Sequence, residues 1–129
     1  MNFKKTLGSD NHSGIHPEML KAICDVNISH APSYGTDSLT EICQKEFKKH
    51  FGEHAETYFV FNGTAANVLC LSTLVESYES VICTDMAHLS YDECGAPEFI
   101  IGCKLDPVPN QNGKLTPDQI LSKLKRRGD

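Results

Sequence analysis

The stretch from Tyr58 to Leu71, YFVFNGTAANVLCL, constrains the fold more than any other part of the chain. An apolar run is followed by Asn-Gly, which between two strands would be a strong β-hairpin signal. After Thr64, however, apolar residues recur at three- and four-residue spacing, as in a helix, whereas a returning strand would alternate every second residue. The stretch therefore predicts a strand over 57–61, a tight turn and a helix.

The start of this helix is a candidate anion site. The first amides of a helix have no intrahelical acceptor, and the helix dipole adds partial positive charge, so phosphate groups bind there readily. Thr64 adds a hydroxyl group that can either cap the helix or donate to a phosphate oxygen. The local pattern favours capping and leaves phosphate binding as the alternative.

Start and stop signals define two helices before this stretch. A turn-rich arm leads to Pro17, which is suited to the first position of a helix. After a loop, Asp37 or Ser38 can cap a second helix, and Gly52 ends it.

Two more strands are predicted after the stretch, over 80–84 and 104–108, and a last helix runs from about Thr116 toward Lys125. Strands that alternate with helices predict an α/β fold with a largely parallel sheet.

Composition argues against two classes of partner. With a formal net charge of -5 and a pI near 5.6, the chain lacks the basic footprint of a nucleic-acid-binding protein. The basic residues from Lys123 to Arg127 lie at the end of an expected helix, where cations favour the dipole. No apolar stretch is long enough to span a membrane, and no signal-peptide pattern follows Met1. We therefore expect a cytoplasmic protein with neither nucleic-acid nor membrane partners.

Cysteine and histidine residues suggest no metal site. The six cysteines are scattered without a C-x-x-C pair, which is typical of reduced, buried thiols. Two pairs of histidines are spaced by four residues: His12 with His16, and His50 with His54. Pro17 and Gly52 break the helices that these pairs would need to bind a metal.

His88 follows the strand predicted over 80–84. It can pair with Cys94 for nucleophilic catalysis, but nothing else supports that pair, and a buried thiol is the expected state of Cys94. In open α/β sheets, ligands bind at the carboxyl ends of strands, where the Asn62-Gly63-Thr64 turn also lies. A single histidine is more often structural, but a planar ring beside a phosphate site favours a flat, phosphorylated cofactor.

Several segments, taken in order, resemble the N-terminal half of low-specificity threonine aldolases: SDNHSGIHPEML, APSYGTD, FVFNGTAANVL, HLSYDECGAPEF and NGKLTPDQI. These enzymes use pyridoxal phosphate and have the aspartate-aminotransferase-like fold. The resemblance runs from about Ser9 to the last residue. It implies an α/β fold, the N-terminal part of the cofactor-binding large domain, with an incomplete parallel sheet. Residues 1–36 would form an arm, helix and loop, and residues 37–129 the first part of that domain.

The resemblance assigns roles around the cofactor. Gly63 and Thr64 align with the Gly-Thr pair that holds the cofactor phosphate in the family, and Asn62 replaces a serine found in some members. His88 aligns with the catalytic histidine that stacks on the pyridine ring near the substrate hydroxyl.

The resemblance also implies substrate contacts and an assembly. Ser9 aligns with the serine of a Ser-Asp arm directed toward the substrate carboxylate. Tyr34 and Gly35 align with a loop that reaches the neighbouring subunit's site, which implies a homo-oligomer. Glu93 aligns with an acidic position to which no role is assigned.

The implied activity is retro-aldol cleavage of threonine-like β-hydroxy-α-amino acids to glycine and an aldehyde, with pyridoxal 5'-phosphate as the electron sink. The family's Schiff-base lysine, its pyridine-pairing aspartate and its carboxylate-binding arginine align beyond Asp129. Lys123 and Lys125 match a polar helix far upstream of that lysine. We therefore expect no covalent cofactor attachment and no activity from this chain alone. The alternative is a non-catalytic assembly or interaction module that acts through the Tyr34 loop.

Overall fold

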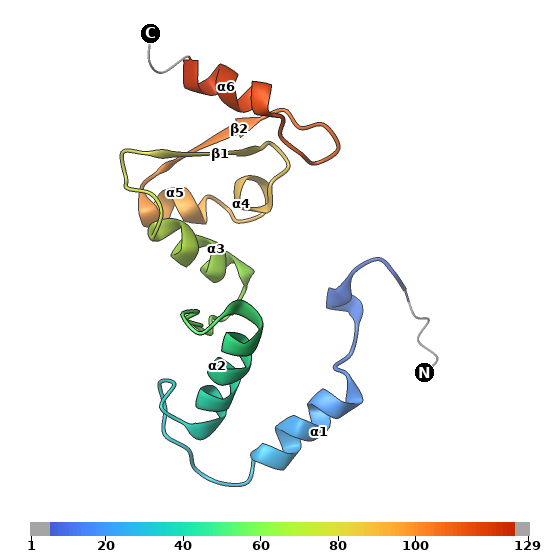
Figure 1. The fold of residues 1–129 in the computed structure, drawn as a ribbon. Helices are drawn as coiled ribbons and strands as arrows, with labels where there is room; N and C mark the ends of the chain where they lie inside the picture. The colour runs from blue at the N-terminus through green and yellow to red at the C-terminus, as the bar shows by residue number, and fades with distance from the viewer. Residues whose placement is uncertain (1–5, 126–129) are drawn as a thin grey trace. The chain divides into compact units, whose positions relative to one another are not determined.

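The computed structural model describes residues 6–125 and divides the chain into two compact units, Met1–Thr57 and Tyr58–Asp129. The first unit contains the short 3-10 helix η1 (Asp10–His12) and the helices α1 (Pro17–Val26) and α2 (Ser38–Phe51). These elements are blue to green in Figure 1. The second unit contains the helices α3 (Gly63–Ser72), α4 (His88–Tyr91), α5 (Ala96–Ile101) and α6 (Pro117–Lys125), and the strands β1 (Ser80–Thr84) and β2 (Lys104–Val108).

Local capping explains the helix boundaries of the first unit. Helix α1 begins at Pro17, as predicted, and the side chain of His16 caps it by accepting from the Glu18 amide at 3.3 Å. Asp37 is the N-cap of α2, and Gly52, with a φ of 100°, is its C-cap. His16 thus lies outside α1 and Gly52 interrupts the other histidine spacing, so neither pair shares an unbroken helix.

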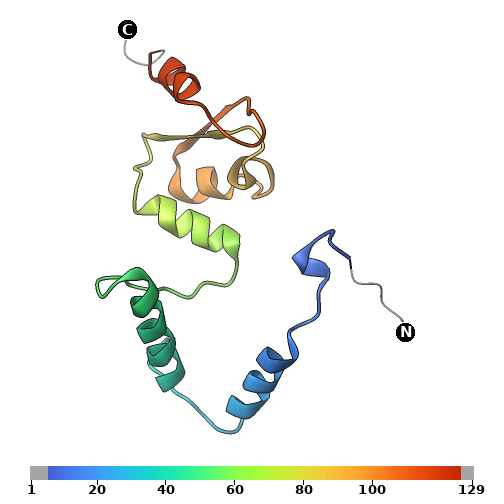
Figure 2. The same cartoon turned by 45° about the vertical axis from the view of Figure 1, so that its right-hand side comes forward.

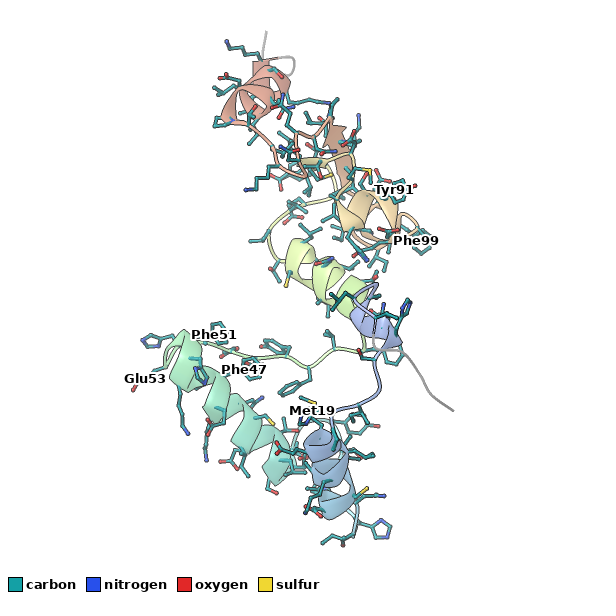
Figure 3. The ribbon with its side chains drawn as sticks, turned by 90° about the vertical axis from the view of Figure 1, so that its right-hand side faces the viewer. Met19, Phe47, Phe51, Glu53, Tyr91 and Phe99 are labelled. Atoms are coloured by element: carbon teal, nitrogen blue, oxygen red, sulfur yellow. The ribbon has the colours of Figure 1, made fainter. Side chains whose placement is uncertain are left out.

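Helices α1 and α2 bury none of their residues. Met19 on α1 is 64% exposed and Phe51 on α2 is 72% exposed. Phe47 and Phe51, labelled in Figure 3, stack with ring centroids 5.9 Å apart. An amphipathic helix gains most of its stability by packing its apolar face, and the described part of the first unit supplies no such packing for these side chains.

The second unit is built on two parallel strands. β1 and β2 pair in register from Ser80 opposite Lys104 to Thr84 opposite Val108, and both have the predicted bounds. The crossover between them contains α4 and α5. Figures 1 and 2 show α3, α4 and α5 on one side of the strand pair and α6 on the other. The largely parallel α/β arrangement predicted from the sequence is confirmed.

The core of the second unit is small. Its buried apolar residues come from α3, β1, β2 and the turn before β2: Val68, Cys83, Cys103, Leu105 and Val108. Pro97 of α5 is also fully buried. This core positions α3 and α5 against each other and α5 against β2.

The strand predicted over 57–61 does not form. A strand needs a neighbour for its backbone groups, and in the described part of the chain the sheet contains β1 and β2 alone. Residues 57–61 lead into α3 without regular secondary structure, and the side chain of Phe61 is 97% exposed. The sheet is incomplete, as expected, and the apolar run is not one of its strands.

The expectation of buried thiols is wrong for four cysteines. Only two are buried, Cys83 and Cys103, and the others are exposed: Cys24, Cys43, Cys70 and Cys94. All six are free thiols. For Cys24 and Cys43, exposure follows from the helices that carry them, since α1 and α2 bury none of their residues. Within residues 6–125, no helix has the length and apolar character needed to cross a membrane.

Candidate functional site

The start of α3 presents hydrogen-bond donors that bond to none of the residues the structure describes. Asn62 is the N-cap, and its Oδ1 accepts from the Ala65 amide at 2.9 Å. The Ala66 amide donates to the Asn62 carbonyl at 3.1 Å. Within residues 6–125, the amides of Gly63 and Thr64 and the Thr64 hydroxyl have no hydrogen-bond partner. Three donors at the positive end of one helix therefore remain available.

This finding excludes one of the two roles that the sequence left open for Thr64. Asn62 caps the helix and Thr64 does not, so the prediction that favoured capping by Thr64 is wrong. The capping residue lies two positions earlier because Asn62 has an extended backbone (φ -155°), which is the usual conformation of an N-cap, whereas Thr64 already lies in the first helical turn.

The residues around position 63 leave room for a side chain, so packing does not require glycine there. A Cβ added at this position would meet no atom within 4 Å, and Gly63 does not have a positive φ. The backbone at position 63 therefore does not depend on a conformation that only glycine adopts. The open space next to the Gly63 amide is accessible to a ligand.

A cavity of about 410 Å³ borders the start of α3. It is lined by residues of the helix start, the first turns of α3 and one residue of α5: Asn62, Thr64, Ala65, Val68, Leu69 and Ile100. The cavity is mostly apolar apart from its Asn62 and Thr64 end. His88 is not among the lining residues.

His88 is connected to α3 through a buried carboxylate. Its Nδ1 lies 2.8 Å from Oε1 of Glu93, and the same oxygen accepts from Nδ2 of Asn67 at 2.6 Å. The Glu93 side chain is 0% exposed, while that of His88 is 64% exposed. Asn67 lies one helical turn after Thr64, so the network joins the histidine to the helix that carries the free donors.

Sequence reasoning missed Asn67 and left Glu93 without a role. Asn67 lies 26 residues before Glu93, and no spacing rule connects positions so far apart. The only available signal was a polar residue on a helix whose other central positions are apolar. His88 begins the short helix α4 and Glu93 follows it five residues later, a spacing that permits a contact without dictating one.

The alternative pairing of His88 with Cys94 is not observed. The Nδ1 atom of His88 bonds to Glu93, and Cys94 is exposed rather than buried. Cys94 (φ 51°) and Gly95 (φ 73°) both adopt left-handed backbone conformations in the turn between α4 and α5. This turn follows Glu93 directly, and it places the carboxylate inside while leaving the thiol outside.

Ser9 and Tyr34, the other two sequence-predicted site residues, belong to the first unit. Ser9 accepts through Oγ from the Asn11 amide at 3.2 Å. Tyr34 has a φ of 64° and Gly35 a φ of 78°, and the Tyr34 side chain is fully exposed. A positive φ is uncommon for an aromatic residue.

The lysines of α6 have a structural environment. Nζ of Lys123 bonds to Oδ1 of Asp106 in β2 at 2.5 Å, and both side chains are largely buried. Lys123 therefore attaches α6 to the sheet. No group of three or more potential metal ligands occurs in the part of the chain that the structure describes.

Comparison with known proteins identifies the family of the chain. Residues 6–129 match the family model described as beta-eliminating lyase. The chain is 48% identical to a low specificity L-threonine aldolase of Pseudomonas sp. (strain NCIMB 10558) and 46% identical to that of Pseudomonas aeruginosa. Each alignment extends over 122 residues and covers 94% of this chain and 35% of the relative.

A solved structure of Leishmania major threonine aldolase matches with a TM-score of 0.82 at 28% identity, covering 92% of this chain and 34% of that one. The chain thus spans about a third of the length of the curated relatives that it matches. The resemblance and the fold class inferred from the sequence are confirmed. With nearly its whole length matching the family model, this chain belongs to the beta-eliminating lyase family.

Proposed function

We propose that this chain contributes to a pyridoxal-phosphate-dependent carbon–carbon lyase that cleaves threonine-like β-hydroxy-α-amino acids to glycine and an aldehyde. The observation that carries the proposal is the set of free donors at the start of α3, connected through Asn67 and Glu93 to His88. Family membership and the names of the relatives support the lyase chemistry and the cofactor.

The start of α3 fits the cofactor phosphate. Two amides and one hydroxyl have no partner among the described residues, and an anion at a helix N-terminus is favoured by the dipole. Open space beside Gly63 allows a phosphate to approach the backbone closely. We propose Gly63 and Thr64 as the phosphate-binding residues.

His88 is proposed to stack on the pyridine ring and to accept the proton of the substrate hydroxyl. Its ring is mostly exposed and is held at Nδ1, so Nε2 is available for proton transfer. When bound, pyridoxal phosphate supplies the electron sink for the carbanion left by carbon–carbon cleavage. Ser9 is proposed to bind the substrate carboxylate, and Tyr34 to act in the neighbouring subunit's site of a homo-oligomer.

Two further proposals concern the extent of the site. Residues 1–36 would act as an arm and residues 37–129 as the first part of the cofactor-binding domain. The resemblance aligns the family's Schiff-base lysine with a position beyond Asp129, and on that basis we propose that the chain alone binds the cofactor non-covalently and does not catalyse cleavage.

The phosphate site can be tested by titrating the 129-residue chain with pyridoxal phosphate and with pyridoxal, followed by fluorescence. We expect pyridoxal phosphate to bind more tightly, because only it carries the group that α3 would hold. Replacing Gly63→Val, which adds a side chain beside the free amides, should reduce this preference. Equal affinities for the two compounds would contradict the proposal and favour the non-catalytic assembly module, which the exposed apolar faces of α1 and α2 would also suit.

Activity is tested by acetaldehyde release from threonine with added cofactor. We expect the 129-residue chain to match the rate of free pyridoxal phosphate. A rate well above that control, abolished in His88→Ala, would refute the proposed inactivity of the chain alone.

A further inference from the structure

One carboxylate oxygen organises the polar residues around His88. Oε1 of Glu93 lies 2.8 Å from Nδ1 of His88 and 2.6 Å from Nδ2 of Asn67. The other oxygen, Oε2, is buried and has no hydrogen-bond partner among the described residues. Burying a carboxylate with one oxygen unpartnered costs stability, so packing does not explain a glutamate at this position.

The network favours a hydrogen on one of the two ring nitrogens. Asn67 donates through its amide group, so Oε1 of Glu93 acts as an acceptor there. An ionised carboxylate only accepts hydrogen bonds, and therefore the bond between Oε1 and the imidazole requires a hydrogen on Nδ1 of His88. In the neutral ring, this leaves Nε2 as the nitrogen with the free electron pair.

The network also holds the ring in place. Glu93 has 0% side-chain exposure, whereas the His88 side chain is 64% exposed and would rotate freely without its partner. Asn67 comes from α3, so the position of the histidine is tied to the helix that starts at Gly63 and Thr64. A second group that orients a catalytic histidine is a common device for selecting its tautomer.

We propose that Glu93, held by Asn67, is a positioning residue that keeps neutral His88 in the Nδ1–H tautomer with Nε2 directed away from the carboxylate. This inference deepens the proposed function, because it names the nitrogen that would accept the substrate hydroxyl proton. It concerns only residues of this chain and can be measured without cofactor.

The tautomer can be read by solid-state ¹⁵N NMR of the 129-residue chain labelled at histidine, a method that works for monomeric and associated protein alike. The sample is kept at about pH 9 so that the two tautomers of the neutral imidazole are compared. His88→Gln identifies the signal of His88 by its loss. We expect the wild-type signal to be that of the Nδ1–H form, whereas free histidine favours the Nε2–H form.

Two variants separate positioning from simple packing. Glu93→Leu keeps much of the buried volume but has no acceptor, and should shift His88 to the Nε2–H form. Glu93→Gln retains an oxygen that can accept from both neighbours, and should keep the Nδ1–H form. A wild-type His88 in the Nε2–H form would overturn the inference whether or not either variant folds, and so would an unchanged tautomer in a folded Glu93→Leu.

Failure of the proposed function would appear in the cofactor titrations and not in the NMR signal of His88. If pyridoxal phosphate and pyridoxal bind equally while His88 is in the Nδ1–H form, the cofactor proposal fails and the tautomer assignment stands. If the phosphate preference is present and His88 is in the Nε2–H form, only the positioning role of Glu93 is refuted.

Discussion

Asn62 and Thr64 lie two residues apart at the start of α3, and we predict that changing them affects different properties. Asn62 caps the helix through the Ala65 amide, while the Thr64 hydroxyl has no partner among residues 6–125. Thr64→Val removes the hydroxyl with little change in shape, and Thr64→Ser retains it. Asn62→Ala removes the cap, whereas Asn62→Asp keeps a capping oxygen and adds a negative charge.

The expected magnitudes follow from these contacts. A hydrogen bond to a charged group contributes about 1.5–3 kcal/mol, so Thr64→Val should weaken pyridoxal-phosphate binding by about 10- to 150-fold. Thr64→Ser should bind nearly as wild type. Losing an N-cap costs about 0.5–2 kcal/mol, so Asn62→Ala should speed hydrogen exchange in α3 by about 2- to 30-fold.

A single variant, Asn62→Asp, separates the effect on helix capping from the effect on cofactor binding. Aspartate caps a helix about as well as asparagine, so hydrogen exchange in α3 should stay close to wild type. The added carboxylate lies beside the proposed phosphate site and should weaken cofactor binding by repulsion. This loss should shrink at high salt if the site remains open to solvent.

The assays are fluorescence titration with pyridoxal phosphate and hydrogen exchange followed by mass spectrometry of the α3 peptide. The reasoning would be refuted if Thr64→Val bound the cofactor as tightly as Thr64→Ser. It would also be refuted if Thr64→Val destabilised α3 as much as Asn62→Ala, because Thr64 would then have the capping role.

Three more predictions follow from the structure. Burial raises the pKa of the Cys83 thiol, so iodoacetamide should label Cys83 more slowly than exposed Cys70 at neutral pH, as measured on peptides; equal rates would contradict it. The pKa of the Cys83 thiol is higher in the folded than in the unfolded protein. The contribution of this thiol to the free energy of unfolding is therefore complete below the unfolded pKa of about 8.5, and it is lost as pH rises through the folded pKa. Lys123→Met should destabilise α6 by about 1–3 kcal/mol in hydrogen exchange, since it removes the ion pair between Lys123 and Asp106, whereas Lys125→Met should have little effect. Apolar side chains exposed on α1 and α2 should make the 129-residue chain self-associate, and a monodisperse, cooperatively unfolding monomer in light scattering and urea titration would show this to be wrong.

The sequence alone determined the features that depend on neighbouring residues. Pro17, Asp37 and Gly52 mark helix boundaries because each acts on backbone groups within one turn of itself. The helical spacing after Thr64 and the apolar runs of β1 and β2 are also short-range signals. They predicted the helix start and both strands correctly, and the ordered motifs predicted the family.

Tertiary structure decided whatever depends on a distant partner. Residues 57–61 have the composition of a strand, but a strand forms only beside another, and β1 and β2 pair with each other. Asn67 meets Glu93 across 26 residues because the core of the second unit brings α3 against α5, and no periodicity in the sequence encodes that contact.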